Sequence, residues 1–440
     1  MSKEKYIFIQ NHEKEIRPLI NDQESLQSVV NGSYVPAERV QSLLEQYETK
    51  VLLYERKDAP IDAGRLLFES AQPATFNVID PLIELLERDE QCAGITLLAD
   101  NVAGKKFLAE NDPHFHVVPS SEHPVFADIP EGPYRAALVL DEGENAPSSV
   151  LLYGAKSVFG AEKLYYLSLG LFGRVAKNIF ESSAAKQNEI DFVFSLDEFS
   201  KQMFCSVLGV PEEKVIITGT PLLEGLRVEE SDVLRQQGRK ALHIADEATT
   251  LLYAGFPSGD FQSAGGDPKL NSLTFEQTLA GVVAAATAEP TRKISLIVRT
   301  HPRARNVEPP LTPMQELPHN MNVVDGDGLT YEEAVYASDI ICCNIYSTES
   351  LLARYRGREA AVFAFPGKGQ LGEILRDNYS EKGEDIIRQS DRMNLIDSPQ
   401  GISEMIRNYQ PREALPFQTD SLERIKNILL SSPADSKPLV

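Results

Sequence analysis

The chain has 440 residues, a formal net charge of −22 at pH 7 and 42% hydrophobic side chains. This composition is typical of a globular protein. The acidic balance argues against nucleic acid or an anionic membrane as a partner, since both require a basic face. Because the chain is longer than a domain with a single hydrophobic core usually is, we expect two domains.

No targeting or membrane-spanning segment is evident in the sequence. A transmembrane helix requires about eighteen or more consecutive apolar residues, and no such run occurs. The apolar stretch near the start is too short for a signal peptide. The four cysteines show no C-x-x-C spacing, which disfavours a disulfide framework and fits a reducing compartment. We therefore expect a cytoplasmic protein without a transmembrane segment.

Residues 1–60 give weak patterns, but from Arg65 onward strand and helix patterns alternate. This alternation predicts an α/β domain built on a parallel sheet. The dipeptide Asp80-Pro81 predicts a helix start, with proline at the first helical position. Strand patterns occupy residues 65–70, 95–99, 136–140, 163–168, 192–195 and 215–217, and helix patterns occupy 80–88, 147–158 and 197–208.

A polar stretch at 227–239 is interpreted as the linker, which places the domain boundary between 1–228 and 229–440. The second half then repeats the α/β rhythm, beginning with a strand pattern at 250–255. Two capping boxes, which are helix-start signals, predict helices: Thr274 with Gln277, and Thr330 with Glu333.

Two strand patterns in the second half end in polar groups suited to phosphate. Residues 294–298 run into a basic loop, and residues 340–345 run into hydroxyl side chains that open a helix. Ligands of parallel sheets bind at the carboxyl ends of the strands, and a helix N-terminus stabilises an anion. We therefore predict a nucleotide diphosphate site. Its candidate residues are Ser258, Gly259, Arg299, His301, Arg303, Ser347, Thr348 and Glu349.

Each of these loops also has a structural interpretation. Arginine and histidine after a strand are often solvated surface residues, and Ser347 is equally suited to be an ordinary N-cap. The sequence Asp325-Gly326-Asp327 matches the D-x-D motif of metal-dependent glycosyltransferases, but a D-G-D-G turn is the stronger interpretation. The pair His114 and His116 fits no known zinc spacing. We expect neither a metal nor a cofactor.

Three stretches resemble the GT-B superfamily: 192–221, 294–303 and 337–366. The second is similar to the R-x-H-P strand end of nucleotide-sugar epimerases and CDP-glycerol-type transferases. The third looks like the unit that holds the donor diphosphate in such enzymes. The resemblance implies an α/β fold of two Rossmann-like domains facing across a cleft, with the acceptor on the N-terminal side.

In chains of this superfamily the last helix, here 420–430, usually crosses back to the N-terminal domain. The resemblance also places Gly219 and Thr220 at the interdomain cleft. One departure stands out, because Leu352 occupies the place where many relatives have an acidic residue that contacts sugar or ribose. Glu349 either takes over that contact or complements the helix dipole. A second departure is the N-terminal loop 70–75, which lacks the glycines found in relatives.

The resemblance implies a glycosyltransferase that uses a nucleotide-activated sugar or polyol as donor and a carbohydrate or polyol as acceptor, in surface polysaccharide synthesis. The departing nucleotide would need positive charge, and the acceptor hydroxyl would need a general base. Glu69, Asp141 and Asp197 are the candidate bases. Two alternatives stay open, a nucleotide-sugar 2-epimerase and a non-catalytic GT-B-fold binding module. A homo-oligomer is compatible with the sequence.

Overall fold

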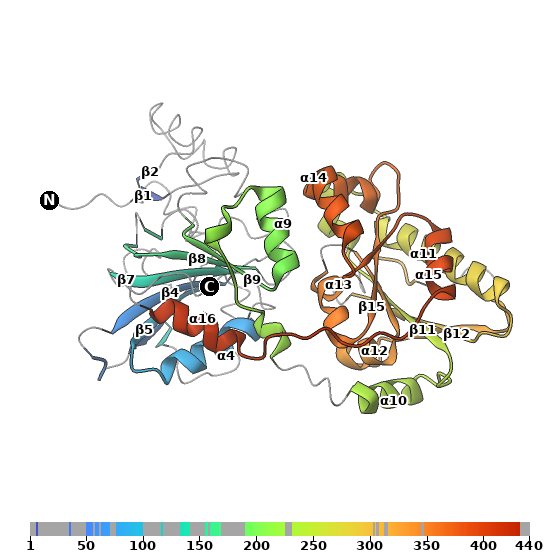
Figure 1. Cartoon of the computed structure of the whole chain (residues 1–440), viewed down its shortest axis with the longest axis horizontal. Helices are drawn as coiled ribbons and strands as arrows, with labels where there is room; N and C mark the ends of the chain where they lie inside the picture. Colours follow the sequence, from blue (N-terminus) through green and yellow to red (C-terminus); the bar gives the residue numbers. More distant parts are fainter. Residues whose placement is uncertain are drawn as a thin grey trace. The chain divides into compact units, whose positions relative to one another are not determined.

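The computed structural model divides the chain into two compact units (Figure 1). Unit 1 comprises Met1–Glu224 with Gln418–Val440, and unit 2 comprises Gly225–Phe417. The boundary predicted at 228/229 falls within 225–230, outside the described residues. The structure describes residues 6–7, 35–36, 50–55, 58–60, 63–70, 76–99, 116–117, 133–140, 155–156, 159–168, 190–224, 231–301, 304, 308–311, 316–344 and 347–431.

The described part of unit 1 contains an eight-stranded sheet with the order β10-β9-β8-β7-β4-β5-β3-β6. The six strands from β10 to β5 are parallel, and β3 pairs antiparallel with both β5 and β6. The chain order reverses between β4 and β7, which is the topological switch point of this sheet. The strands are β3 (Lys50–Glu55), β4 (Gly64–Ser70), β5 (Cys92–Ala99), β6 (His116–Val117), β7 (Tyr134–Leu140), β8 (Leu164–Leu167), β9 (Phe192–Ser195) and β10 (Val215–Ile217); β1 (Tyr6–Ile7) and β2 (Val35–Pro36) pair separately.

Unit 1 has three described α-helices: α4 (Phe76–Glu87), α9 (Glu198–Leu208) and α16 (Ser421–Leu430). The short 3₁₀ helices η3 (Glu212–Lys214) and η4 (Pro221–Leu223) flank β10. The predicted helix start at Asp80 was wrong, because α4 begins at Phe76 and contains Pro81 in its interior. Val78 and Ile79 are fully buried, so packing of this first turn outweighs the local start signal.

The C-terminal helix α16 packs on α4 and β7, and its Ile425 and Leu429 belong to the core of unit 1 (Figure 1). Both ends of the helix make hydrogen bonds to charged side chains. At its N-terminus the Glu224 carboxylate accepts hydrogen bonds from the Ser421 hydroxyl, at 2.7 Å, and from the Leu422 amide. At its C-terminus Arg135 donates to the Leu430 carbonyl over 2.6 Å. Both contacts have the sign that the helix dipole favours.

Unit 2 contains a six-stranded sheet, parallel throughout, with the order β13-β12-β11-β14-β15-β16. Numbered along the chain this is 3-2-1-4-5-6, the order of dinucleotide-binding folds, with its switch point between β11 and β14. The strands are β11 (Thr249–Ala254), β12 (Ile294–Arg299), β13 (Met321–Asp325), β14 (Ile340–Cys343), β15 (Glu359–Phe363) and β16 (Asn394–Ile396).

Helices lie on both faces of this sheet (Figure 1). They are α10 (Ser231–Ala241), α11 (Leu270–Ala288), α12 (Tyr331–Ala337), α13 (Thr348–Leu352), α14 (Leu371–Gln389) and α15 (Pro399–Arg407), with the 3₁₀ helices η6 (Ser258–Ala264) and η7 (Arg354–Arg356). The capping box predicted at Thr330 is confirmed. The one at Thr274 was wrong, because α11 begins a turn earlier and the Thr274 hydroxyl donates to the Leu270 carbonyl over 2.7 Å.

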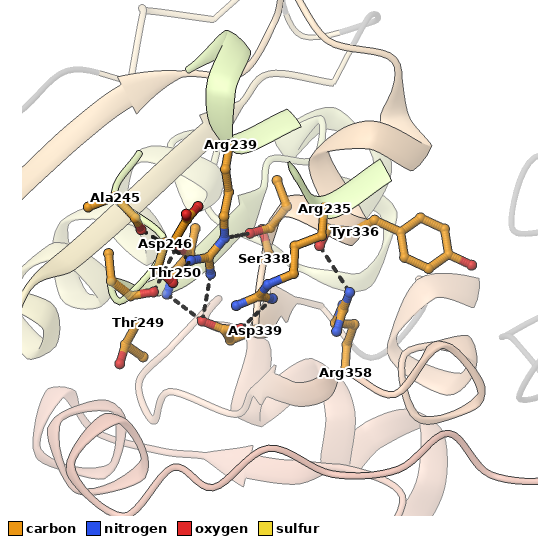
Figure 2. A network of polar contacts seen from close by, with 12 residues as sticks. Arg235, Arg239, Ala245, Asp246, Thr249, Thr250, Tyr336, Ser338, Asp339 and Arg358 are labelled. Atoms are coloured by element: carbon orange, nitrogen blue, oxygen red, sulfur yellow. Dashed lines mark hydrogen bonds and ion pairs between the residues drawn. The ribbon is translucent and has the colours of Figure 1, made fainter. Parts of the chain in front are cut away.

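The polar stretch expected to be a linker is instead largely helix α10. Figure 2 shows why this hydrophilic helix is stable in the fold. Arg235 and Arg239 both pair with Asp339, at 2.6 and 3.0 Å, and the side chains of Arg239 and Asp339 are only 2% and 6% exposed. Arg239 also donates to the carbonyls of Ala245 and Asp246. The network joins α10 to the amino-terminal edge of the sheet.

Candidate functional site

The carboxyl ends of β11, β12 and β14 meet at the switch point of unit 2, since β11 lies between the other two strands. The sheet therefore brings three loops to one edge: the loop after β11 with Ser258, the loop after β12 with His301, and the loop after β14 with Ser347. An open α/β sheet binds ligands at such an edge. The sequence had singled out these same three loops.

The amide of Ser258, expected to bind phosphate, is already engaged. The Ser258 backbone amide donates to the Glu308 carboxylate. The Ser258 hydroxyl accepts a hydrogen bond from the backbone amide of Asn271 at 3.0 Å. The Ser258 side chain is buried, whereas Gly259 is exposed with open space around it. Sequence reasoning missed Glu308, because its only local signal is an acidic residue in a proline-rich stretch.

Arg299 was expected to provide positive charge for a phosphate, but its side chain holds the loop after β13. Its Nη1 donates to the carbonyls of Gly326 and Leu329 over 3.2 and 2.6 Å. Its guanidinium also lies 5.6 Å from the ring centroid of Tyr331. These carbonyls satisfy one end of the guanidinium fork, so we assign Arg299 a structural role at this edge.

His301 follows directly after Thr300 at the end of β12 and is half-buried at the same edge. Its carbonyl accepts a hydrogen bond from the Ala304 amide at 2.8 Å. A Cβ added to Gly255 would lie 3.6 Å from the His301 amide, so the loops after β11 and β12 approach each other closely here. Arg303 lies outside the described residues.

The D-G-D sequence forms a turn, as the stronger sequence interpretation proposed. The Asp325 carboxylate accepts from the amide of Asp327, and the Asp327 carboxylate accepts from the amide of Thr300, each over 2.8 Å. Both side chains thus stabilise backbone next to β12. Among the residues that the structure describes, no group of three or more His, Cys, Asp or Glu side chains is placed to hold a metal ion.

Ser347 is the N-cap of α13, and its hydroxyl accepts from the Glu349 amide at 3.2 Å. This is the structural role that sequence reasoning had weighed beside phosphate binding. For Thr348 the structure describes the backbone only, at the first position of the helix. Leu352, at the place where relatives have an acidic residue, is buried with 1% exposure and contributes an apolar side chain.

Glu349 is held by two neighbours. Its Oε2 lies 2.6 Å from Nη1 of Arg356, and the Tyr331 hydroxyl donates to the carboxylate. Burial raises the pKa of Glu349, an effect that Arg356 and the Tyr331 hydrogen bond partly offset and that the nearby Glu332 carboxylate reinforces. These contacts favour the electrostatic, structural interpretation of Glu349 over a ribose contact.

Three cysteines of the described chain are buried: Cys92, Cys342 and Cys343. Burial raises the pKa of Cys92 to about 11 and that of Cys342 to about 12, and it raises the pKa of Cys343 well above its ordinary value. Because the thiolate is the nucleophile, these thiols are unreactive at neutral pH. Cys342 and Cys343 therefore form part of the sheet core beside the site.

In unit 1 the candidate bases fall in different environments. Glu69 stands near the carboxyl end of β4, opposite Val139 of β7, and so lies at the switch point of this sheet. Asp197 is the N-cap of α9, and its Oδ1 accepts from the Ser200 amide at 2.8 Å. Asp141 lies outside the described residues. Glu69 is thus the described candidate at the position where such sheets bind ligands.

Gly219 and Thr220 follow β10 at the end of the first segment of unit 1. Gly219 has a φ of 77°, and a Cβ there would lie 3.1 Å from Cβ of Ser421. Glycine is thus required both by the positive φ and by the close approach of Ser421 at the start of α16. Thr220 is fully buried.

Sequence reasoning overlooked a G-x-G-x-x-G pattern at residues 367–372, which follows β15 and opens α14. In dinucleotide-binding folds such a turn follows the first strand and binds pyrophosphate. Here it follows the fifth strand of unit 2, and the Gly369 amide donates to the Glu373 carboxylate over 2.6 Å. A Cβ on Gly372 would lie 2.4 Å from the Ala364 carbonyl oxygen. Turn geometry and close packing therefore explain these glycines.

No protein-family model and no curated protein matches the chain, but solved structures do. The UDP-GlcNAc 2-epimerase from Neisseria meningitidis bound to UDP-GlcNAc superposes with a TM-score of 0.51 at 14% identity, covering 83% of this chain and 99% of that one. MurG from Acinetobacter baumannii gives 0.48 at 10% identity, with 83% and 99% coverage. The wall teichoic acid polymerase TagF gives 0.40 at 12% identity, with 96% and 97% coverage.

The superposed 2-epimerase has the GT-B fold, and its TM-score at 14% identity supports a likeness of fold. The described residues form no helix long and apolar enough to cross a membrane. Each unit carries a mainly parallel, helix-covered sheet that reverses its strand order at a switch point. With its two Rossmann-like domains, the chain has the fold of the GT-B superfamily.

Proposed function

We propose that this chain is a glycosyltransferase that uses a nucleotide-activated sugar or polyol as donor and a carbohydrate or polyol as acceptor, in surface polysaccharide synthesis. One observation carries the proposal. His301 and the N-cap Ser347 follow β12 and β14, the two strands that flank β11 at the switch point of unit 2. A nucleoside diphosphate is the ligand that suits an imidazole and helix amides at one sheet edge.

Departure of the nucleoside diphosphate develops negative charge, which the site must stabilise. We assign this to His301 and to the Thr348 amide, with Arg303 as a further cation supplied by the loop after β12; the Ser347 amide already donates to the Asn344 carbonyl at 3.1 Å. Arg299 supports the site indirectly, because it holds the loop after β13 next to His301. Preorganised donors of this kind stabilise a transition state more than a flexible charge would.

The acceptor hydroxyl must lose a proton as it attacks the donor. We assign the general base to Glu69, because it is a described carboxylate at the switch point of unit 1. Asp197 is a weaker candidate, since its carboxylate already caps α9. A general base contributes about 10²–10⁴-fold to such reactions, so its removal is readily measured.

A nucleotide-sugar 2-epimerase is the second candidate. It is favoured by the likeness to the UDP-GlcNAc 2-epimerase, whose structure superposes with the TM-score of 0.51. The 2-epimerases show an S-G-G-x-x-E-E pattern in the loop after β14, whereas this chain has Ser347-Thr348-Glu349-Ser350. We therefore rank epimerisation below transfer.

The experiment is a panel of UDP-, CDP- and GDP-sugars and CDP-glycerol, each incubated with the full chain with and without oligosaccharide or polyol acceptors. Acceptor-dependent release of nucleotide, lost in Glu69→Gln, supports transfer. Conversion of UDP-GlcNAc to its 2-epimer without acceptor supports epimerisation. Nucleotide binding without turnover identifies a binding module, and the absence of both binding and turnover refutes the proposed function.

A further inference from the structure

We propose that Glu308 is a positioning residue of the nucleotide site, which locks the loop after β12 onto the loop after β11. This inference rests on the proposed function for its ligand. The loop after β12 begins with His301 and carries Arg303 and Arg305 before it reaches Glu308. A residue that fixes the far end of this loop therefore helps to set the position of His301 at its start.

One carboxylate joins two donors that belong to different parts of the chain. Oε1 of Glu308 accepts from the Ser258 amide, and Oε2 accepts from Nδ2 of Asn271 at 3.1 Å. Ser258 and Asn271 are each only 1% exposed. A hydrogen bond to a charged acceptor is stronger than one to a neutral acceptor. Because both donors are buried here, water also competes little for them.

The direction of the Asn271 amide is fixed by its other contacts. Its Oδ1 lies 2.9 Å from the Tyr253 hydroxyl and accepts from the Phe256 amide at 3.3 Å. The Nδ2 group is therefore the one that faces Glu308, and only an acceptor can satisfy it. The Ser258 amide is likewise a donor, so the position requires two acceptor atoms, which a carboxylate provides.

The near end of the loop also makes contacts within the fold. His301 continues β12, and Ala304 is fully buried while its carbonyl accepts from the Glu308 amide at 2.9 Å. A loop fixed at both ends loses less entropy when a ligand orders it, which favours binding. Because the Ser258 amide already donates to the Glu308 carboxylate, it cannot donate to a diphosphate. The diphosphate would therefore bind to His301 and the loop after β14.

The test exchanges donor and acceptor between the two side chains. Glu308→Gln places an amide nitrogen where one of two acceptors is needed. Asn271→Asp places a second carboxylate against that of Glu308. The double variant Glu308→Gln/Asn271→Asp restores one donor facing one acceptor. Glu316→Gln is the matched control, because it removes the same charge from an exposed position in the same connection.

Calorimetry with UDP, CDP and GDP measures nucleotide affinity. Hydrogen exchange of the Ser258 amide, measured without nucleotide, reports whether Glu308 still binds that amide. We expect each single variant to raise the nucleotide Kd about tenfold and to speed Ser258 exchange about tenfold, with the double variant returning both within about threefold of wild type. Glu316→Gln should change neither.

The two failures are distinguishable. If the wild-type chain binds none of the nucleotides, the proposed function fails and the exchange data alone decide whether Glu308 forms the lock. If the wild-type chain binds nucleotide but the single variants keep its affinity, Glu308 does not position the site. Unchanged Ser258 exchange in Glu308→Gln, or a double variant no better than the singles, overturns the lock itself.

Discussion

Arg356 and Glu349 form an ion pair across one short helical segment, with Nη1 2.6 Å from Oε2 and side chains only 11% and 19% exposed. Arg356 thereby compensates the charge of the acidic side chain in the first turn of α13, the helix end that the proposed diphosphate would face. The Tyr331 hydroxyl donates to the same carboxylate, and its ring lies beside Arg299. Glu349 is thereby connected through Tyr331 to Arg299 at the end of β12.

Glu349 should make the fold less stable as pH rises. Burial raises its pKa in the folded chain, so the folded state holds this proton more tightly than the unfolded state. The contribution is therefore fully present below the unfolded pKa of about 4.3 and is lost as pH rises through the folded value. Glu349→Gln does not titrate, so its stability relative to wild type should increase from pH 4.5 to pH 7 in urea unfolding. Parallel pH profiles of the two proteins would contradict this.

His301→Ala should weaken nucleotide binding by about 1.5–3 kcal/mol, the usual cost of a hydrogen bond to a charged group. Calorimetric titration with the nucleotide that the screen identifies measures the loss. His319→Ala is the control, because His319 is exposed and precedes β13, away from the carboxyl ends of the strands. Equal affinities of the two variants would remove His301 from the site.

Asp339→Ala should destabilise unit 2 by about 3–5 kcal/mol, because it leaves Arg239 buried without its carboxylate. Burial already lowers the pKa of Arg239, an effect that Asp339 counteracts. Chemical denaturation followed by circular dichroism measures the change. In the control Glu247→Ala, the broken pair with Lys293 is exposed, so the loss of stability should be far smaller. Similar losses of stability in both variants would show that the network in Figure 2 contributes little to the stability of unit 2.

Asp197 and Glu69 should separate into a structural and a catalytic carboxylate. Asp197→Asn keeps a capping oxygen and should leave stability and turnover unchanged, whereas Asp197→Ala should cost about 1 kcal/mol of stability. Glu69→Gln should fold normally and lower turnover about 10²–10⁴-fold. Loss of turnover in Asp197→Asn with unchanged stability would instead make Asp197 the base.

Glu69 also illustrates how far pattern reasoning reaches. Its place at a strand end was visible in the sequence, because an apolar run stops there. Its place at the switch point was not, because that depends on β7 pairing with β4 rather than with β5. Strand order is set by which hydrophobic faces pack together, and residues distant in sequence decide that.

The alternation of apolar runs with helix signals determined the α/β class, the loops at the carboxyl ends of β12 and β14, and local caps such as Thr330. These features depend on neighbours a few residues apart, which is the range that a sequence pattern reports. The resemblance to the GT-B superfamily predicted two Rossmann-like domains, and the superposed fold agrees with that prediction.

Only the tertiary structure decided what the charged side chains do. Arg299 holds a loop about thirty residues away, Arg239 pairs with Asp339, and Glu308 bonds to Ser258. A long charged side chain has many rotamers, and its direction is chosen by the carbonyls and carboxylates that the fold brings within reach. Residue type and strand position therefore predicted which loops form the candidate site, whereas the packed sheet determined which groups their charged side chains contact.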